Sequence, residues 1–126
     1  MGAFEDKASA KVKALIDFIS EGDFDSISSV AEIEESWCSE DQTQQEGIAD
    51  FGKWITMQLE GWSEDYGTEF VVDPFNEECL NIDPSEGGTV FGEYNPTSHG
   101  EPLDFWFELE FEDKDGEPML RFNVNV

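Results

Sequence analysis

Basic side chains are scarce in this sequence. Its 126 residues include 6 Lys and Arg against 31 Asp and Glu, which gives a formal net charge of -25 at pH 7. No basic residue lies between Lys13 and Lys53, or between Lys53 and Lys114. Such a chain repels nucleic acids and anionic membranes, and it attracts basic protein surfaces or cations over a range that salt sets. We therefore expect no direct contact with nucleic acid or with a membrane.

Histidine, cysteine and long apolar runs are also scarce. His99 is the single histidine, and a lone histidine in a polar loop is typical of a surface residue. Cys38 and Cys79 match no metal-binding spacing, and we expect free thiols unless the fold brings the two together. No apolar run approaches the ~18–20 residues of a membrane-spanning helix, and no signal-peptide pattern opens the chain. These absences predict a cytoplasmic protein with no cofactor and no metal.

Motifs that carry catalysis are missing as well. The sequence has no Gly-rich phosphate loop and no nucleophile elbow. The stretch 113–117 is similar in composition to a calcium loop. With Gly116 at position six of an EF-hand, however, positions one and twelve are Phe111 and Phe122, which cannot bind calcium. We predict a hairpin turn at this stretch and a protein that is not an enzyme.

The clearest pattern lies in the C-terminal stretch, where apolar residues occupy alternate positions on both sides of a turn at 113–116. They are Leu103, Phe105, Phe107, Leu109 and Phe111, followed by Leu120, Phe122, Val124 and Val126. Side chains of a strand alternate between two faces. The pattern therefore predicts a long antiparallel β-hairpin over 103–126, with one buried face and one wet face.

Helical spacing dominates the first half of the chain. It predicts an amphipathic helix over 5–20 that ends at Gly22. Asp23 or Asp25 is the expected cap of a short second helix, whose apolar face runs from Phe24 to Ile33. A third helix is expected to begin near Ser39 or Asp41. Its apolar stripe is Ile48, Phe51, Ile55, Leu59 and Trp62.

Shorter strand signals fill the middle of the chain, at 69–72, 79–82 and 89–94, between Gly and Pro breakers. Helices come first and strands follow, an order typical of α+β folds. We predict one acidic α+β domain over 1–126. About three N-terminal helices pack on one face of a C-terminal antiparallel sheet, which ends in the long hairpin.

The step Gly22-Asp23-Phe24 between two expected helices, followed by long strands, resembles the small cone-shaped domains related to nuclear transport factor two. The resemblance covers these three residues and the general shape. It implies a ligand pocket between the helices and a curved sheet. A third helix before the first clear strand departs from the usual order of that fold, so we do not assign the chain to the family.

The polar face of the strand 103–111, extended by one residue, carries the candidate partner-binding side chains. They are Asp104, Trp106, Glu108, Glu110 and Glu112. Side chains two residues apart on a strand lie roughly 6–7 Å apart, similar to neighbouring phosphates on a nucleic-acid strand. A solvated face that favours solubility and discourages aggregation is the other interpretation. It leaves the tryptophan among the acids unexplained.

Three functions fit these observations. The one we favour is a non-enzymatic acidic inhibitor that blocks a basic surface of a nuclease or another nucleic-acid-binding protein, as immunity proteins, anti-CRISPR proteins and DNA mimics do. The second is a protein whose acidity reflects a high-salt cytoplasm and is unrelated to its function. The third is a cone-like α+β domain that binds or converts a small molecule.

Overall fold

The computed structural model describes residues 3–83 and 89–125. Two α-helices lie in this part of the chain, α1 (Ala3–Glu21) and α2 (Gln44–Tyr66), with the short 3-10 helices η1 (Phe24–Ser29), η2 (Glu35–Trp37) and η3 (Glu77–Cys79). The strands are β1 (Ala31–Ile33), β2 (Leu80–Asp83), β3 (Thr89–Tyr94), β4 (Thr97–Ser98), β5 (Glu101–Pro102), β6 (Trp106–Lys114) and β7 (Glu117–Asn125).

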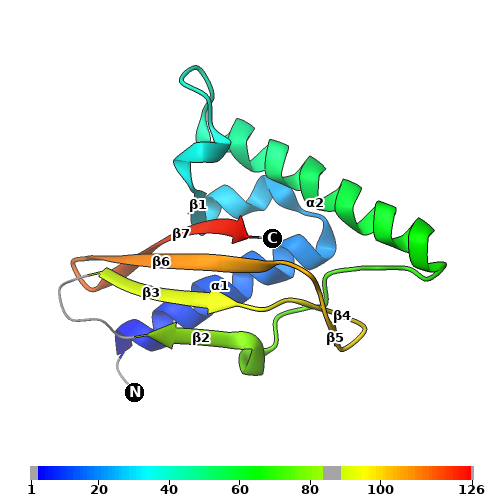
Figure 1. Cartoon of the computed structure of the whole chain (residues 1–126). Helices are drawn as coiled ribbons and strands as arrows, with labels where there is room; N and C mark the ends of the chain where they lie inside the picture. The colour runs from blue at the N-terminus through cyan, green and yellow to red at the C-terminus, as the bar shows by residue number, and fades with distance from the viewer. Residues whose placement is uncertain (1–2, 84–88, 126) are drawn as a thin grey trace.

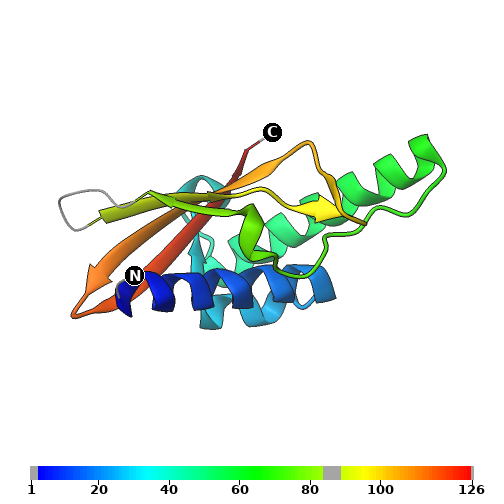
Figure 2. The same cartoon turned by 90° about the horizontal axis from the view of Figure 1, so that it is seen from below.

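The main sheet has five strands among the described residues, in the order β1-β7-β6-β3-β2. All neighbouring pairs are antiparallel except β1 with β7. The helices pack on one face of this sheet, and no described element covers the other face (Figures 1 and 2). The predicted class, α+β with a mostly antiparallel sheet, is confirmed. No helix among the described residues is long and apolar enough to cross a membrane.

Both α-helices end where glycine allows a left-handed backbone. Gly22 follows α1 with φ 75°, and Gly67 caps α2 with φ 69°.

The start of α2 differs from the prediction. Thr43 is the N-cap and forms a capping box with Glu46, in which each side chain accepts a bond from the other's backbone N–H. The helix therefore begins after Thr43 and is capped by neither Ser39 nor Asp41.

The second predicted helix is wrong in type and extent. Residues Phe24–Ser29 form a single 3-10 helix, and Ile33 lies in strand β1. Strand β1 pairs in parallel with β7, and Ile33 aligns with Phe122. Ile33 is fully buried in this strand. Tertiary pairing thus overrides the local helical spacing.

The outer edge of β1 is blocked by a side chain. The backbone N–H of Ile33 donates to Gln44 Oε1 at 2.7 Å, and Gln44 Nε2 donates to the carbonyl of Ile33 at 3.1 Å. The Gln44 amide therefore takes the place of a neighbouring strand. Occupied edge groups cannot pair with another chain, so this contact protects the sheet against edge-to-edge association.

Strands β6 and β7 are joined by a turn of two residues. Lys114 aligns with Glu117 across the pair. Asp115 and Gly116 between them have φ values of 55° and 86°, the positive pair that a type I′ turn requires. The loop is thus shorter than the predicted turn at 113–116. The first strand begins at Trp106 rather than at Leu103.

The alternating apolar row of β6 and β7 forms the centre of the core. Phe105, Phe107, Leu109 and Phe122 are buried as predicted, whereas Val124 is half-buried and Val126 lies outside the described residues. Phe51 of α2 lies over this row. Its ring centroid is 6.1 Å from that of Phe107 and 5.3 Å from that of Phe122. Edge-to-face geometry of this kind adds to the free energy of burial.

The segment 69–72, predicted as a strand, forms no sheet ladder. Its backbone groups bind side chains instead. Phe70 N–H donates to Ser63 Oγ at 2.8 Å, and Val71 N–H donates to Ser98 Oγ at 3.0 Å. Two hydroxyls thus satisfy donors that a strand would direct to its neighbour. The prediction at 89–94 matches β3, and β2 begins at Leu80 rather than at Cys79.

One carboxylate organises the loop that contains β4 and β5. Asp73 accepts hydrogen bonds from Gly100 N–H at 2.9 Å, Thr97 Oγ1 at 2.7 Å and His99 N–H at 2.9 Å. Burial alone would raise the pKa of Asp73, but these donors outweigh it and the pKa is lowered. The ionised carboxylate therefore holds the residues 97–100 in place.

Candidate functional site

The uncovered face of the sheet, which we call the open face, contains most of the predicted binding residues. Trp106, Glu108, Glu110 and Glu112 alternate along β6, and their side chains point away from the buried Phe107 and its row. Asp104 is exposed, but it precedes β6 and belongs to no strand. The structure therefore groups four of the five predicted residues on one strand face.

The strand register extends this set into two rows across the sheet. In the first row, Glu108 aligns with Glu93 of β3 and with Asn123 of β7. In the second row, Glu110 aligns with Phe91 and Arg121 in the same two strands. Each row continues into the outer strands. The additional members are Asn81 and Asp83 in β2, Glu32 in β1, and Glu34 beside it.

Two carboxylates of the first row stand directly opposite each other. Glu93 and Glu108 are register partners on adjacent strands, and both side chains are exposed. Cβ atoms of such partners are about 4.5–5.5 Å apart, and like charges at this distance destabilise a sheet. A bound cationic group would relieve the repulsion, so this pair favours a basic ligand over an uncharged one.

Arg121 of β7 is the basic residue that lines the hollow of the open face described below. Its Nη2 lies 3.5 Å from Glu32 Oε2, and its Nε is buried without a hydrogen-bond partner. Hydrogen bonds from Ser36, and more weakly the charge of Arg121, hold the pKa of Glu34 below its usual value. Arg121 is thus an internal counter-ion, which lets several carboxylates share one sheet face.

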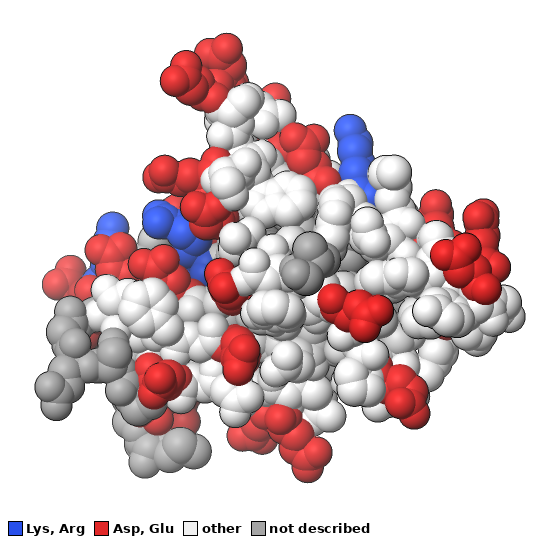
Figure 3. All heavy atoms as spheres, viewed as in Figure 1, with Lys and Arg blue, Asp and Glu red and all other residues white. Residues whose placement is uncertain are grey.

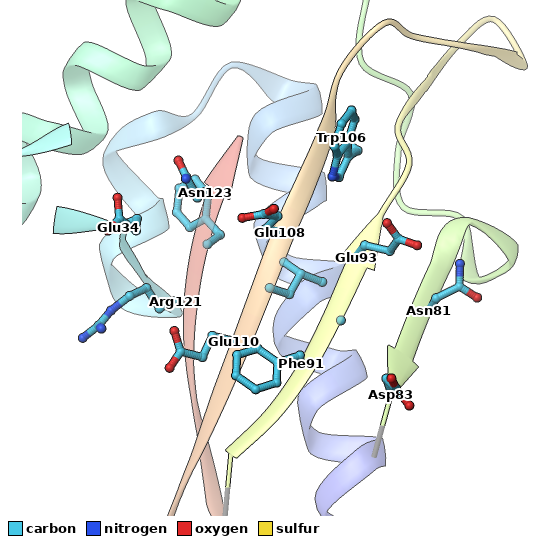
Figure 4. A pocket seen from close by; sticks show the side chains of 13 residues that line it. Glu34, Asn81, Asp83, Phe91, Glu93, Trp106, Glu108, Glu110, Arg121 and Asn123 are labelled. Carbon is cyan, nitrogen blue, oxygen red and sulfur yellow. The ribbon is translucent and has the colours of Figure 1, made fainter. Parts of the chain in front are cut away.

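A hollow of about 470 Å³ lies on the open face (Figure 4). Side chains of both rows line it, with Trp106 at one end and Phe91 at the other. Gly92 also lines it, and a Cβ atom at this position would lie 2.7 Å from the carbonyl oxygen of Asn81. Glycine is therefore required for the close approach of β2 and β3 beneath the hollow.

Two large aromatic side chains are exposed at this hollow. Phe91 is 53% exposed and Trp106 is 36% exposed. They are about 13 Å apart along the strand direction, since Phe91 aligns with Glu110 four residues from Trp106. Figure 3 shows the acidic side chains of this face separated by uncharged surface rather than joined in one stripe. The face thus combines apolar anchors with dispersed negative charge.

The hairpin pattern places Arg121 and Asn123 on the polar face beside β6, but the parts of the open face in β1, β2 and β3 were not predicted as neighbours of β6. Glu93 was assigned to a strand, but nothing in the local pattern showed that this strand lies beside Glu108. Glu32 and Glu34 were missed because β1 was not predicted. The one available signal was the alternation of polar and apolar residues in 89–94, which places Glu93 on the polar face.

The reactive side chains of the chain do not line the hollow. Cys38 and Cys79 are both free thiols. Burial, with smaller effects from Glu78 and Asp73, raises the pKa of Cys79, which disfavours the nucleophilic thiolate. His99 Nε2 contacts the carbonyl of Glu69 at 3.1 Å. No group of three or more His, Cys, Asp or Glu residues in the described parts of the chain is arranged to hold a metal ion.

Comparison with known proteins assigns no family. No protein-family model and no curated protein matches the sequence. The chain is similar to a solved structure whose name carries the label NTF2 and a series of point substitutions, with 15% sequence identity and a TM-score of 0.48. The match covers 96% of this chain and 99% of that one. The TM-score is too low to assign the chain to that fold.

Proposed function

We propose that this protein binds and blocks a basic surface of a nuclease or another nucleic-acid-binding protein, and that the open face is the contact surface. The mode of action is that of an immunity protein, an anti-CRISPR protein or a DNA mimic. The single observation that carries the proposal is the composition of the uncovered sheet face. Its two rows contain the carboxylates of Glu32, Glu34, Asp83, Glu93, Glu108 and Glu110, with exposed aromatic rings among them.

Charge and aromatic rings have separate roles in this proposal. The net charge of -25 accelerates encounter with a basic surface and makes association depend on salt. Trp106 and Phe91 supply apolar contact area, and buried aromatic residues carry much of the binding free energy at interfaces. We therefore expect the carboxylates to set the association rate and Trp106 to set the dissociation rate.

The cone-like alternative is less well supported. It requires a ligand cavity between the helices and the sheet. In the structure this space holds the rings of Phe51, Phe107 and Phe122, each at most 1% exposed, and Phe51 contacts the other two. The hollow on the open face lies on the opposite side of the sheet. The alternative would therefore need a ligand site outside the predicted position.

The proposal is tested by identifying the partner with a matched pair of variants. Wild-type protein, Glu108→Gln/Glu110→Gln and Glu40→Gln/Asp41→Asn are cross-linked in the native host extract, and the captured proteins are identified by mass spectrometry. The second variant loses the same charge from an exposed loop. We expect wild type and the loop variant to capture a protein that has a Lys/Arg-lined groove. The sheet variant should capture less of that protein.

Inhibition of the captured protein is the deciding measurement. Its nucleic-acid binding or cleavage should fall when wild-type protein is added, and the sheet variant should inhibit less than the loop variant at the same concentration. Capture of a protein without a basic surface, or equal inhibition by both variants, would contradict the proposal.

A further inference from the structure

A second hollow lies on the helical side of the molecule and has no role in the proposed function. It is a groove of about 970 Å³ between the end of α1, helix η1, the second half of α2 and the segment 67–72. No residue of the sheet strands lines it. The groove and the open face are therefore separate surfaces.

The α2 wall of the groove has helical spacing. Ile55, Leu59 and Ser63 are four residues apart and form its deeper line, since Ile55 is buried and the other two are half-buried. Thr56 and Glu60, one position further along, are exposed and form the rim. From Ile55 to Glu64 the wall is about 14 Å long. A partner helix of about nine residues has the same length.

The opposite walls are apolar as well. Ile19 ends the buried stripe of α1, and Phe24 opens η1 and packs edge-on against Phe51, with ring centroids 6.2 Å apart. Phe70 and Val72 form the third side. The hydrogen bond from Phe70 N–H to Ser63 Oγ ties this side to α2. Packing of Phe24 and the hydrogen bond of Phe70 thus fix two sides of the groove against α2.

The rim of the groove carries charge of one sign. Acidic residues from three elements line it: Glu21, Glu60, Glu64 and Glu69. All four side chains are exposed, and no Lys or Arg is among the lining residues. An apolar floor with an acidic rim is complementary to a segment that has apolar side chains on one face and basic side chains on its flanks.

We infer that this groove docks a basic amphipathic helical segment of a partner protein. Apolar side chains of that segment contact the partly exposed Phe24, Leu59 and Phe70, and its Lys or Arg side chains lie between Glu60 and Glu21 at the rim. This site does not depend on the open face.

The probe for this inference is a synthetic peptide of about 18 residues with leucines at helical spacing and lysines elsewhere. A scrambled peptide of the same composition is the control, because any polycation is attracted to this chain. We expect the amphipathic peptide to bind about tenfold more tightly, since burial of one additional leucine is worth that factor or more. Backbone amide shifts in the NMR spectrum should change at Phe24, Leu59 and Phe70.

Two variants test the location of the peptide. Glu60→Lys/Glu64→Lys cancels the net charge of the four rim glutamates without touching the floor, and Glu40→Lys/Asp41→Lys makes the same charge change in the loop before α2. We expect the rim variant to lose the preference for the amphipathic peptide and the loop variant to keep it. Leu59→Asn removes floor contact. Met57→Asn, at a residue that is 69% exposed outside the groove, is its control.

The results separate this inference from the proposed function. Equal affinity for both peptides, or amide shifts confined to the sheet strands, would overturn the groove as a docking site. A preference that Glu108→Gln/Glu110→Gln abolishes would overturn it too, because the peptide would then lie on the open face. Self-association of the chain through the groove, seen as a concentration-dependent mass that Glu60→Lys/Glu64→Lys removes, would also contradict the inference.

Discussion

Asp73→Asn is the substitution with the most specific expected effect on stability. The variant keeps the size of the side chain and removes its charge. The carboxylate accepts three hydrogen bonds, from Gly100 N–H, Thr97 Oγ1 and His99 N–H. An amide has one acceptor oxygen, so at least one of the three donors loses its partner. A hydrogen bond to a charged group is worth about 1.5–3 kcal/mol, and we expect the free energy of unfolding to fall by about that amount at pH 7.

The pH dependence of the free energy of unfolding gives a second check on the role of Asp73. The pKa of Asp73 is lowered in the folded state, so its stabilisation is present above the unfolded-state pKa of about 3.9 and is lost as pH falls through the folded-state value. Protonated aspartic acid resembles asparagine. The difference in stability between wild type and Asp73→Asn should therefore shrink as pH is lowered from 7 toward the folded-state pKa.

Urea denaturation at several pH values measures this difference directly. Asp104→Asn is the matched control, because Asp104 is exposed and lies outside the strands, and we expect it to change stability by less than about 0.5 kcal/mol. A stability difference for Asp73→Asn that stays constant with pH, or is absent at pH 7, would refute the role assigned to the carboxylate.

Three further predictions concern the core, the sheet edge and the charge. Phe107→Ala should lower the free energy of unfolding by about 3–5 kcal/mol, since Phe107 is 0% exposed; a loss below about 1 kcal/mol would contradict its central place. Gln44→Ala should cost about 1–3 kcal/mol, because it leaves both backbone groups of Ile33 unpaired, whereas the neighbouring Gln45→Ala should cost less. Melting temperature should rise from low to moderate NaCl as self-repulsion is screened, and a continuing requirement for molar salt would favour the high-salt interpretation of the acidity.

Local periodicity was sufficient to predict the elements with regular patterns. The stripe of α1 and the buried row from Phe105 to Phe122 follow spacings of 3.6 and 2, which depend only on neighbouring residues. Two elements were mispredicted for a common reason, namely a distant partner. Strand β1 forms because Ile33 lies beside Phe122, and 69–72 forms no ladder because Ser63 and Ser98 bind its N–H groups.

The candidate site shows the same limit of prediction from local sequence patterns. The polar face of β6 could be predicted from alternation alone. The hairpin also predicted β7 as a neighbour of β6, but the other strands could not be placed, because strand register depends on the whole sheet. Glu32 and Arg121, for example, are 89 residues apart in sequence and 3.5 Å apart in the structure. The groove between α1 and α2 was not predicted at all, since its walls come from four separate segments.

The most direct test of the open face as a binding surface is the association rate with the captured basic partner, measured by stopped flow at several NaCl concentrations. For wild-type protein and Glu40→Gln/Asp41→Asn, we expect fast association that falls steeply as salt rises. For Glu108→Gln/Glu110→Gln, the rate at low salt should be lower and its salt dependence shallower, while Trp106→Ala should mainly accelerate dissociation. Identical rates and salt dependences for the sheet and loop variants, with dissociation unchanged by Trp106→Ala, would show that the partner docks elsewhere.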